Sequence, residues 1–207
     1  MKHSELQLQD PKLISKLKLK FLMRLKYFLH LASFYFFKFE SWHISSIESR
    51  EYCLDAVSYI NSKVRLDDLV VEIGCGLGET IDRINTKKRY GYDLSKQVIS
   101  AAKIHHMFGN TEFQVGSFNS VAGQKIQYLI ALNFLHDFDD MTVASWLDSI
   151  ISNNEISYLI LDEVADPAYE NNHNFSKILP ENFLFLESIG REYRYNRRLK
   201  VFKNNGA

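Results

Sequence analysis

The sequence is poor in features that would place it in several familiar classes. It has only two cysteines, Cys53 and Cys75, and therefore neither a disulfide framework nor a cysteine-rich metal cluster. Its 25 basic and 25 acidic residues cancel, which argues against a dedicated nucleic-acid-binding protein, because such proteins usually carry excess positive charge. The aromatic-rich run 27–37 is too short to span a bilayer, and no signal peptide is visible. We therefore expect a compact, cytoplasmic protein.

The basic residues are concentrated near the N-terminus. Residues 11–39 hold seven lysines and arginines and no acidic residue, so the rest of the chain is net acidic. Leucines and aromatic residues recur there at spacings of three and four, which predicts an amphipathic helix over 11–37 with a basic face. We expect this helix to pack on the rest of the protein and help cover a cofactor; the alternative is a contact with a membrane surface or a partner. The sequence thus divides into a basic, aromatic-rich helical segment, residues 1–45, and one domain, residues 46–207.

What the sequence does contain is a glycine-rich turn directly after an apolar strand. Residues 69–73 predict the strand, and the turn supplies the residues that we expect to bind a cofactor, Glu72, Gly74, Cys75, Gly76 and Gly78. Glycines let a ligand lie against the backbone, since no Cβ stands in the way. The dinucleotide-binding fingerprint has its third glycine one position later, where this chain has Glu79, and a carboxylate there would repel a pyrophosphate. Glu72 and Glu79 suit the sulfonium and ammonium groups of S-adenosylmethionine, so the turn predicts a methyl-donor site.

A second acidic residue ends the next strand of the chain. Residues 90–93 predict a short strand that ends in Asp93, and Leu94 follows before a helix over 95–107 that Ser95 caps. A carboxylate at this place can accept hydrogen bonds from both ribose hydroxyls of a nucleoside. We therefore expect Asp93 and Leu94 to lie beside the same cofactor.

Predicted strands and helices alternate through most of the chain. A helix over 47–61 precedes the first strand, and later strands are predicted at 111–115, 127–132 and 158–162, with helices at 79–85 and 141–151. The chain ends with two strands, 183–189 and 199–203, that no helix separates. This alternation predicts an α/β fold with a parallel, doubly wound sheet, in which ligands bind beyond the carboxyl ends of the strands.

Taken together, the sequence E-x-G-x-G-x-G-E over 72–79 and the acidic strand end at Asp93 resemble motifs I and II of the class I S-adenosylmethionine-dependent methyltransferases. The resemblance implies a Rossmann-like, seven-stranded sheet whose last two strands form an antiparallel hairpin, with additional N-terminal helices. It implies S-adenosyl-L-methionine as the cofactor. The segments 37–43, 50–52, 133–136, 169–175 and 190–194 further resemble a small bacterial group associated with surface-polysaccharide or secondary-metabolite gene clusters.

The same resemblance assigns three more cofactor-binding residues at strand ends. The class often has an acidic residue where this chain has Ser117, contacting the adenine amino group; Ser117 can make one hydrogen bond there, and Phe118 can stack on the purine. Asn133 follows the predicted strand 127–132 and is the third. Trp42, His43 and Tyr169 are the residues that we expect to line the substrate mouth.

The catalytic residues are predicted from the chemistry of the acceptor. Methyltransferases that act on amino groups of adenine, cytosine or glutamine carry an (N/D)-P-P-(Y/F) box after the fourth strand, and this chain has none. It has His136 there instead, and a histidine can take a proton from a hydroxyl near neutral pH. His173 and Glu163 are further candidates for this role, and we expect no metal because the spacing matches no familiar metal site.

These patterns favour O-methylation of a sugar or another small polar metabolite. Three alternatives stay open: methylation of RNA, methylation of nitrogen or carbon in a small molecule, and a non-catalytic protein that binds the cofactor as a partner subunit. The neutral net charge disfavours RNA, although the basic N-terminal helix partly restores that possibility.

Overall fold

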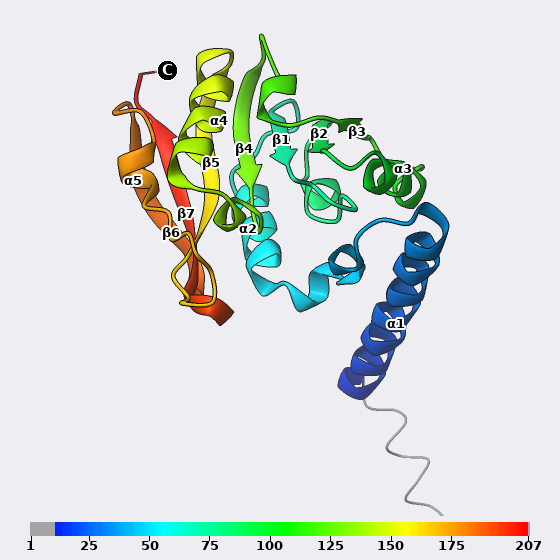
Figure 1. The fold of residues 1–207 in the computed structure, drawn as a ribbon. Coiled ribbons are helices and arrows are strands. Elements are labelled where there is room, and N and C mark those ends of the chain that lie inside the picture. The colour runs from blue at the N-terminus through cyan, green and yellow to red at the C-terminus, as the bar shows by residue number, and fades with distance from the viewer. Residues whose placement is uncertain (1–10, 207) are drawn as a thin grey trace, which may run out of the picture.

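A seven-stranded sheet forms the centre of the protein (Figure 1). The computed structural model describes residues 11–206, without the side chains of residues 11–19 and 22, so the predicted domain limits at residues 1 and 207 lie outside the described part. The strand order is β3-β2-β1-β4-β5-β7-β6. The strands are β1 (Leu69–Ile73), β2 (Lys88–Asp93), β3 (Thr111–Val115), β4 (Lys125–Ala131), β5 (Glu155–Val164), β6 (Phe183–Tyr193) and β7 (Arg197–Asn204).

The first five strands are parallel, whereas β7 pairs antiparallel with both β5 and β6. The doubly wound sheet with its terminal antiparallel hairpin, predicted from the alternation of elements and from the family resemblance, is therefore confirmed. Because parallel strands end at the same edge, the turns after β1, β2, β3 and β4 come together there.

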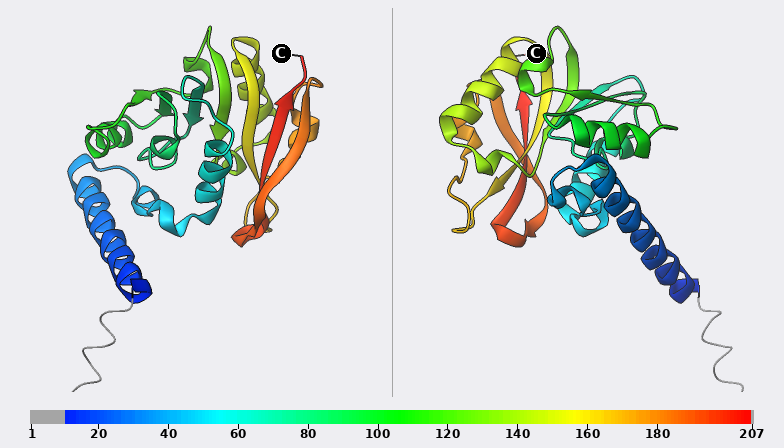
Figure 2. Two further views of the ribbon diagram at one scale, coloured as in Figure 1. Left: turned by 180° about the vertical axis from the view of Figure 1, so that it is seen from behind. Right: turned by 45° about the vertical axis from the view of Figure 1, so that its right-hand side comes forward.

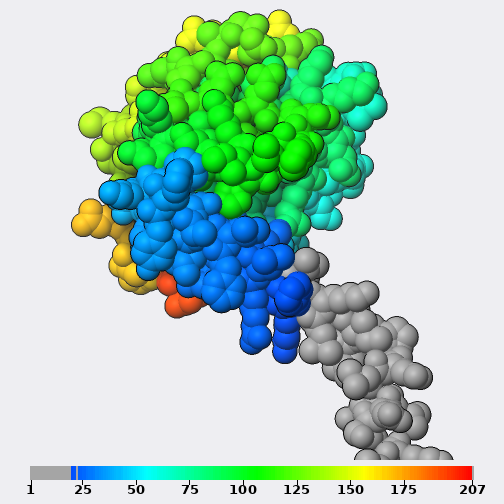
Figure 3. Space-filling view, turned by 90° about the vertical axis from the view of Figure 1, so that its right-hand side faces the viewer, coloured from blue at the N-terminus to red at the C-terminus, as the bar shows by residue number. Residues whose placement is uncertain are grey.

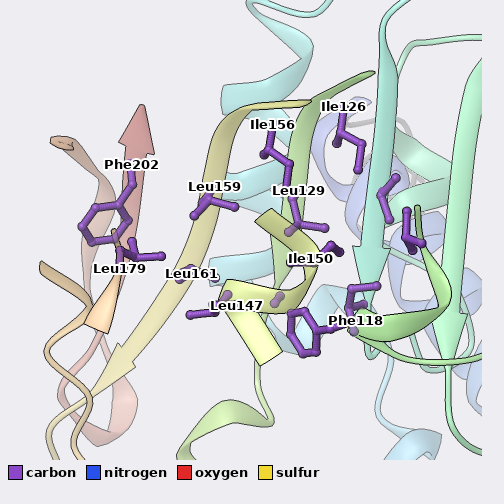
Figure 4. Close-up of a cluster of buried hydrophobic side chains, with 14 of the residues drawn as sticks. Phe118, Ile126, Leu129, Leu147, Ile150, Ile156, Leu159, Leu161, Leu179 and Phe202 are labelled. Carbon is purple, nitrogen blue, oxygen red and sulfur yellow. The ribbon is translucent and has the colours of Figure 1, made fainter. Parts of the chain in front are cut away.

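Helices cover both faces of the sheet (Figure 2). α2 (Glu51–Asn61) and α3 (Lys96–His105) pack on one face, and α4 (Asp140–Ser152) and α5 (Phe175–Ile178) pack on the other. The alternation of side chains along β1 matches this arrangement: Val70 belongs to the α2 side and Val71 to the α4 side, and both are buried. Leu129, Leu147 and Leu159 illustrate how the α4 side fills with interdigitating apolar groups (Figure 4).

Two predicted helices differ in the structure. The helix predicted over 79–85 is wrong: the chain forms only a single 3₁₀ turn, Ile81–Arg83, because Glu72 accepts the Ile81 N–H and Asn61 binds the Arg83 carbonyl and the Asn85 N–H. The helix predicted over 47–61 is split into a 3₁₀ turn, Ile47–Ser49, and α2, since Arg50 adopts a non-helical conformation between them.

The predicted N-terminal helix is present as α1 (Pro11–Phe37). It ends where Lys38 adopts a left-handed φ of 57°. The C-terminal part of α1 contacts α3 and the 3₁₀ turn Ser41–Ile44, and its N-terminal part projects away from the sheet (Figure 1). Among the described residues, no helix is long and apolar enough to cross a membrane.

Candidate functional site

A cavity of about 1110 Å³ lies at the carboxyl ends of β1, β2, β3 and β4. All the predicted site residues line it except Gly78, His136, His173 and Glu163. One part, which we call the strand-end half, consists of residues 72–77, 93–95, 116–118 and 132–134. The other, the rim half, consists of Glu40, Trp42, His43, residues 48–53, Tyr169, residues 191–195 and Arg197.

The three glycines of the turn all adopt left-handed φ angles, and their surroundings differ. A Cβ on Gly74 would lie 2.7 Å from the ring of Phe134, and one on Gly78 would lie 2.3 Å from the ring of Phe113. Packing therefore requires these two glycines. A Cβ on Gly76 would lie 3.1 Å from Nδ1 of His43, and both residues line the cavity, so a side chain at this position would crowd the cavity wall. Gly78 does not line the cavity.

Two buried carboxylates line the strand-end half. Oε2 of Glu72 accepts the N–H of Ile81 at 3.0 Å, and burial raises the pKa of Glu72 to about 8 against the opposing charge of Arg50. Asp93 accepts the N–H groups of Gly76 at 3.1 Å and Ser95 at 2.9 Å, and its pKa is raised by burial. Each Asp93 oxygen retains capacity for another donor, since a carboxylate oxygen offers two lone pairs. A ligand with hydroxyl or ammonium donors would satisfy both groups.

Glu79 does not face this half, which corrects the electrostatic argument made from the sequence. Its Oε2 accepts the Ile47 N–H at 2.7 Å and pairs with Arg50 at 3.1 Å, and Lys26 lies 3.7 Å from its Oε1. The buried Glu79 carboxylate holds the N-terminal segment against the domain. Of the two glutamates, only Glu72 lines the cavity.

Arg50 is a cavity-lining residue that the sequence pattern did not assign to the site. Its Nε is buried without a hydrogen-bond partner, while a terminal nitrogen pairs with Glu79. A buried guanidinium with an unused donor beside a cavity can bind a carboxylate. The sequence showed Arg50 only as part of the family resemblance, because its position near the glycine turn depends on the break between the 3₁₀ turn Ile47–Ser49 and α2.

The rim half is rich in tyrosine and arginine. Tyr169 contacts Tyr195 edge to face at 5.6 Å, and the guanidinium of Arg194 lies over the Tyr195 ring at 4.6 Å. No carboxylate within the described residues pairs with Arg194, whereas Arg191 pairs with Glu51. Aromatic faces and a free guanidinium can bind a polar, ring-shaped or anionic group.

A buried ion pair supports this half from behind. Arg197 donates to Asp162 at 2.6 Å, with both side chains almost fully buried, and its guanidinium lies over the ring of Tyr52 at 4.4 Å. Asp162 also accepts the N–H of Asn133 at 2.9 Å. Asp162 therefore joins the end of β4 to β7 and does not line the cavity itself.

The three predicted catalytic residues lie outside the cavity. His173 is buried, and its ring nitrogens bind Asp140 at 2.6 Å and the carbonyl of Leu135 at 2.8 Å. Glu163 pairs with Lys200 on β7 at 2.9 Å. The ring of His136 contacts the ring of Tyr169 edge to face at 4.5 Å. Its buried Nδ1 has no partner, and burial lowers the pKa of His136.

His43 is the histidine that lines the cavity. Its ring stacks on Trp42 at 3.6 Å, and Trp42 is 61% exposed at the cavity rim. Burial, followed by the charge of Arg50, lowers the pKa of His43 to about 4, so its ring is neutral at neutral pH. Across residues 11–206 no group of three or more His, Cys, Asp or Glu side chains is arranged to hold a metal ion.

No protein-family model matches the chain, and no curated protein matches it in sequence. Solved structures match it in fold. The magnesium protoporphyrin IX methyltransferase ChlM of Synechocystis PCC 6803, solved with bound SAH, shares 17% identity and a TM-score of 0.63, covering 77% of this chain and 84% of ChlM. The N-methyltransferase NodS of Bradyrhizobium japonicum WM9, in complex with S-adenosyl-l-homocysteine, has 15% identity and a TM-score of 0.63, covering 75% and 87%. A Pyrococcus horikoshii OT3 protein has 14% identity and a TM-score of 0.60, covering 78% and 93%.

Because the sequence identities are only 14–17%, these similarities show the fold alone. The chain has the Rossmann-like fold of S-adenosylmethionine-dependent methyltransferases, with the seven-stranded sheet and terminal hairpin predicted from its sequence.

Proposed function

We propose that this protein is a cytoplasmic S-adenosyl-L-methionine-dependent methyltransferase. The proposal rests on one observation: Gly76 and Asp93 line the same wall of the cavity, and the Gly76 N–H donates to the Asp93 carboxylate. The backbone of Gly76, which carries no side chain, lies there beside a buried acceptor for hydroxyl groups. Solved methyltransferases of the same fold, ChlM and NodS, contain SAH, and this supports the choice of cofactor.

The residues of the strand-end half, together with Arg50 of the rim half, match the parts of S-adenosylmethionine. Asp93 would accept the ribose hydroxyls, and Glu72 would accept the methionine ammonium. Arg50 would bind the methionine carboxylate through the Nε that otherwise lacks a partner. Ser117 and Phe118 would lie at the adenine, with Phe118 offering little surface because it is only 1% exposed and packs against Trp146.

The favoured acceptor is a small polar molecule, such as a sugar or a metabolite of the kind that surface-polysaccharide or secondary-metabolite assembly uses. The cavity of about 1110 Å³ exceeds the roughly 300–1,000 Å³ of typical small-molecule sites, so a second ligand fits beside the cofactor. The tyrosines and Arg194 of the rim half support a polar or anionic acceptor. Methyl transfer to a hydroxyl is favoured over transfer to an amine, since the chain lacks the amino-methylase box.

The proton acceptor for such a hydroxyl is proposed among the histidines near the cavity. His43 is better placed than His136, because His43 lines the cavity, whereas His136 does not and packs against Tyr169. A base that positions and accepts a proton contributes roughly 10²–10⁴-fold to the rate. Since the His43 ring stays neutral down to about pH 4, the rate should change little between pH 8 and pH 5 if His43 is the base.

The experiment is a transfer assay with S-adenosylmethionine labelled in its methyl group and a panel of small hydroxylated and aminated compounds. We expect label in a hydroxylated compound, and His43→Ala should reduce turnover more than His136→Ala while both keep cofactor affinity. Cofactor binding without transfer to any compound would favour a non-catalytic partner subunit. Transfer only to amines would replace the hydroxyl acceptor with a nitrogen acceptor.

A further inference from the structure

The outward face of α1 carries a continuous stripe of exposed apolar side chains. Phe21 is 66% exposed, Phe28 63% and Phe36 79%, and they follow one another at helical spacings of seven and eight residues. Leu25, Leu29 and Tyr35 lie between them and are also exposed. Residues spaced by three, four, seven and eight positions share one side of a helix, so these side chains form a single surface.

The opposite face of α1 is already occupied, which fixes the direction of the stripe. Lys26 pairs with Glu48 at 2.9 Å, His30 bonds to the carbonyl of Ile44, and Ser33 bonds to His105 of α3. Phe34 and other apolar residues of α1 pack on a small cluster that contains Phe39, Ile44 and Leu77. Figure 3 shows this segment, in blue, lying against the green surface that α3 and its neighbours form. The stripe therefore faces away from the domain.

The charge around the stripe points to one kind of partner. Lys20 and Arg24, both exposed, lie along one edge of the stripe. Residues 11–39 contain seven lysines and arginines without any acidic residue, whereas the remainder of the chain is net acidic. An apolar face bordered by cations matches the interface of an anionic bilayer, where the apolar groups enter the acyl boundary and the cations meet the headgroups.

We propose that α1 docks this protein on an anionic membrane surface, with the stripe of Phe21, Leu25, Phe28, Leu29, Tyr35 and Phe36 in the interface. The helix lies in the plane of the surface and does not cross it, in keeping with its charged residues. The proposal is independent of the methyl-transfer reaction. It differs from the expectation that α1 covers the cofactor, because the cavity lining begins only after α1, at Glu40.

Docking would also place the cavity near the membrane. Glu40, Trp42 and His43 line the cavity immediately after the end of α1 at Phe37. The contacts between α1 and Glu48 hold the helix and this rim together.

The test measures binding of the full chain to sedimented vesicles of phosphatidylcholine alone and of phosphatidylcholine mixed with phosphatidylserine. We expect binding to the mixed vesicles that weakens strongly when salt is raised from about 0.1 M to 1 M, because the Debye length falls from about 10 Å to 3 Å. Phe21→Ser with Phe28→Ser should weaken binding about 100-fold, since the membrane interface would no longer bury two aromatic side chains. Lys20→Gln with Arg24→Gln should weaken it about 25-fold.

Matched controls lie at the far edge of the sheet. Lys177→Gln with Lys203→Gln removes two exposed charges from α5 and β7, and Leu184→Ser with Leu186→Ser removes two exposed apolar groups from β6. Both pairs should leave vesicle binding unchanged. Thermal unfolding should be unchanged in the α1 variants, because the altered side chains point outward.

Three results would overturn the proposal. The first is no binding to either vesicle, and the second is equal binding to both, which would remove the electrostatic component. The third is self-association without vesicles, measured by analytical ultracentrifugation, that Phe21→Ser with Phe28→Ser abolishes. That result would make the stripe a contact between copies of this chain.

Discussion

The two halves of the cavity are built in different ways. The strand-end half comes from turns that directly follow parallel strands, and its key contacts join residues close in the sequence, such as Gly76 and Asp93. The rim half joins segments that are far apart: Glu51 meets Arg191, Asp55 meets Tyr193, and Tyr52 lies under Arg197. The first half uses backbone and strand ends, whereas the second uses long side chains from loops.

This difference in construction suits the two halves of the cavity to different ligands. A wall made of backbone and strand ends is rigid and suits a constant ligand such as a cofactor. A rim made of tyrosine and arginine side chains can change its acceptor by substitution without altering the sheet. We therefore expect substitutions in the strand-end half and at Arg50 to affect cofactor binding. Substitutions elsewhere in the rim half should affect acceptor use or stability.

The largest expected effect in the strand-end half follows from Gly76→Val. A β-branched side chain is strained at the left-handed φ of 55° and would occupy the space beside His43, so binding of S-adenosylhomocysteine should be abolished. Gly123→Val is the control, because Gly123 has a similar φ of 68° but open space around it. Calorimetry should find lost binding only in the first variant. Equal loss in both would assign the effect to backbone strain.

The rim half should respond most strongly in stability. Asp162→Ala leaves Arg197 buried without its partner, which typically costs about 3–5 kcal/mol of unfolding free energy. Urea unfolding measures this change, and Lys125→Ala, which breaks an exposed pair with Glu155, should change it by about 1 kcal/mol or less. Similar losses in both variants would show that the buried pair does not hold the rim.

A smaller effect is expected from Asp93→Ala. Loss of a charged acceptor for the ribose hydroxyls should weaken cofactor binding by about 1.5–3 kcal/mol, with the fold intact. Glu112→Ala alters an exposed carboxylate on the neighbouring strand β3 and should leave the affinity unchanged. An unaltered dissociation constant in Asp93→Ala would mean that the ribose does not lie at this strand end.

The smallest expected effect is a pH dependence that arises from Glu72. Burial raises its pKa to about 8, so the carboxyl is mostly protonated at pH 6, and a ligand ammonium favours the ionised form. Cofactor affinity should therefore rise by about tenfold between pH 6 and pH 8, until the ligand's own amino group begins to lose its proton. In Glu72→Gln this rise should be absent. A variant that keeps the full rise would assign the titration to another group.

The sequence was a good guide to the strand-end half because its signals are local. The succession of strands along the chain, the Ser95 cap, which accepts the Val98 N–H, and the places of Gly76 and Asp93 at strand ends all follow from short segments. The sequence could not show that Gly78 lies outside the cavity, because the ring that requires a glycine at this position belongs to Phe113, on another strand.

The rim half could not be assembled from the sequence for the same physical reason. The Glu79 side chain binds Ile47 and Arg50, which lie 32 and 29 residues earlier in the sequence. The position of His136 depends on Tyr169, which the loop after β5 carries over it. Contacts of this kind leave no periodic signal in the sequence, so the sequence alone does not show which side chains lie at the cavity.

The most direct test of the central claim is a calorimetric titration of the purified protein with S-adenosylhomocysteine and, separately, with NAD. We expect saturable binding of S-adenosylhomocysteine, far tighter than that of NAD, because the Glu72 carboxylate, once ionised, can bind the ligand's ammonium group, which NAD lacks. Tighter binding of NAD than of S-adenosylhomocysteine would contradict it.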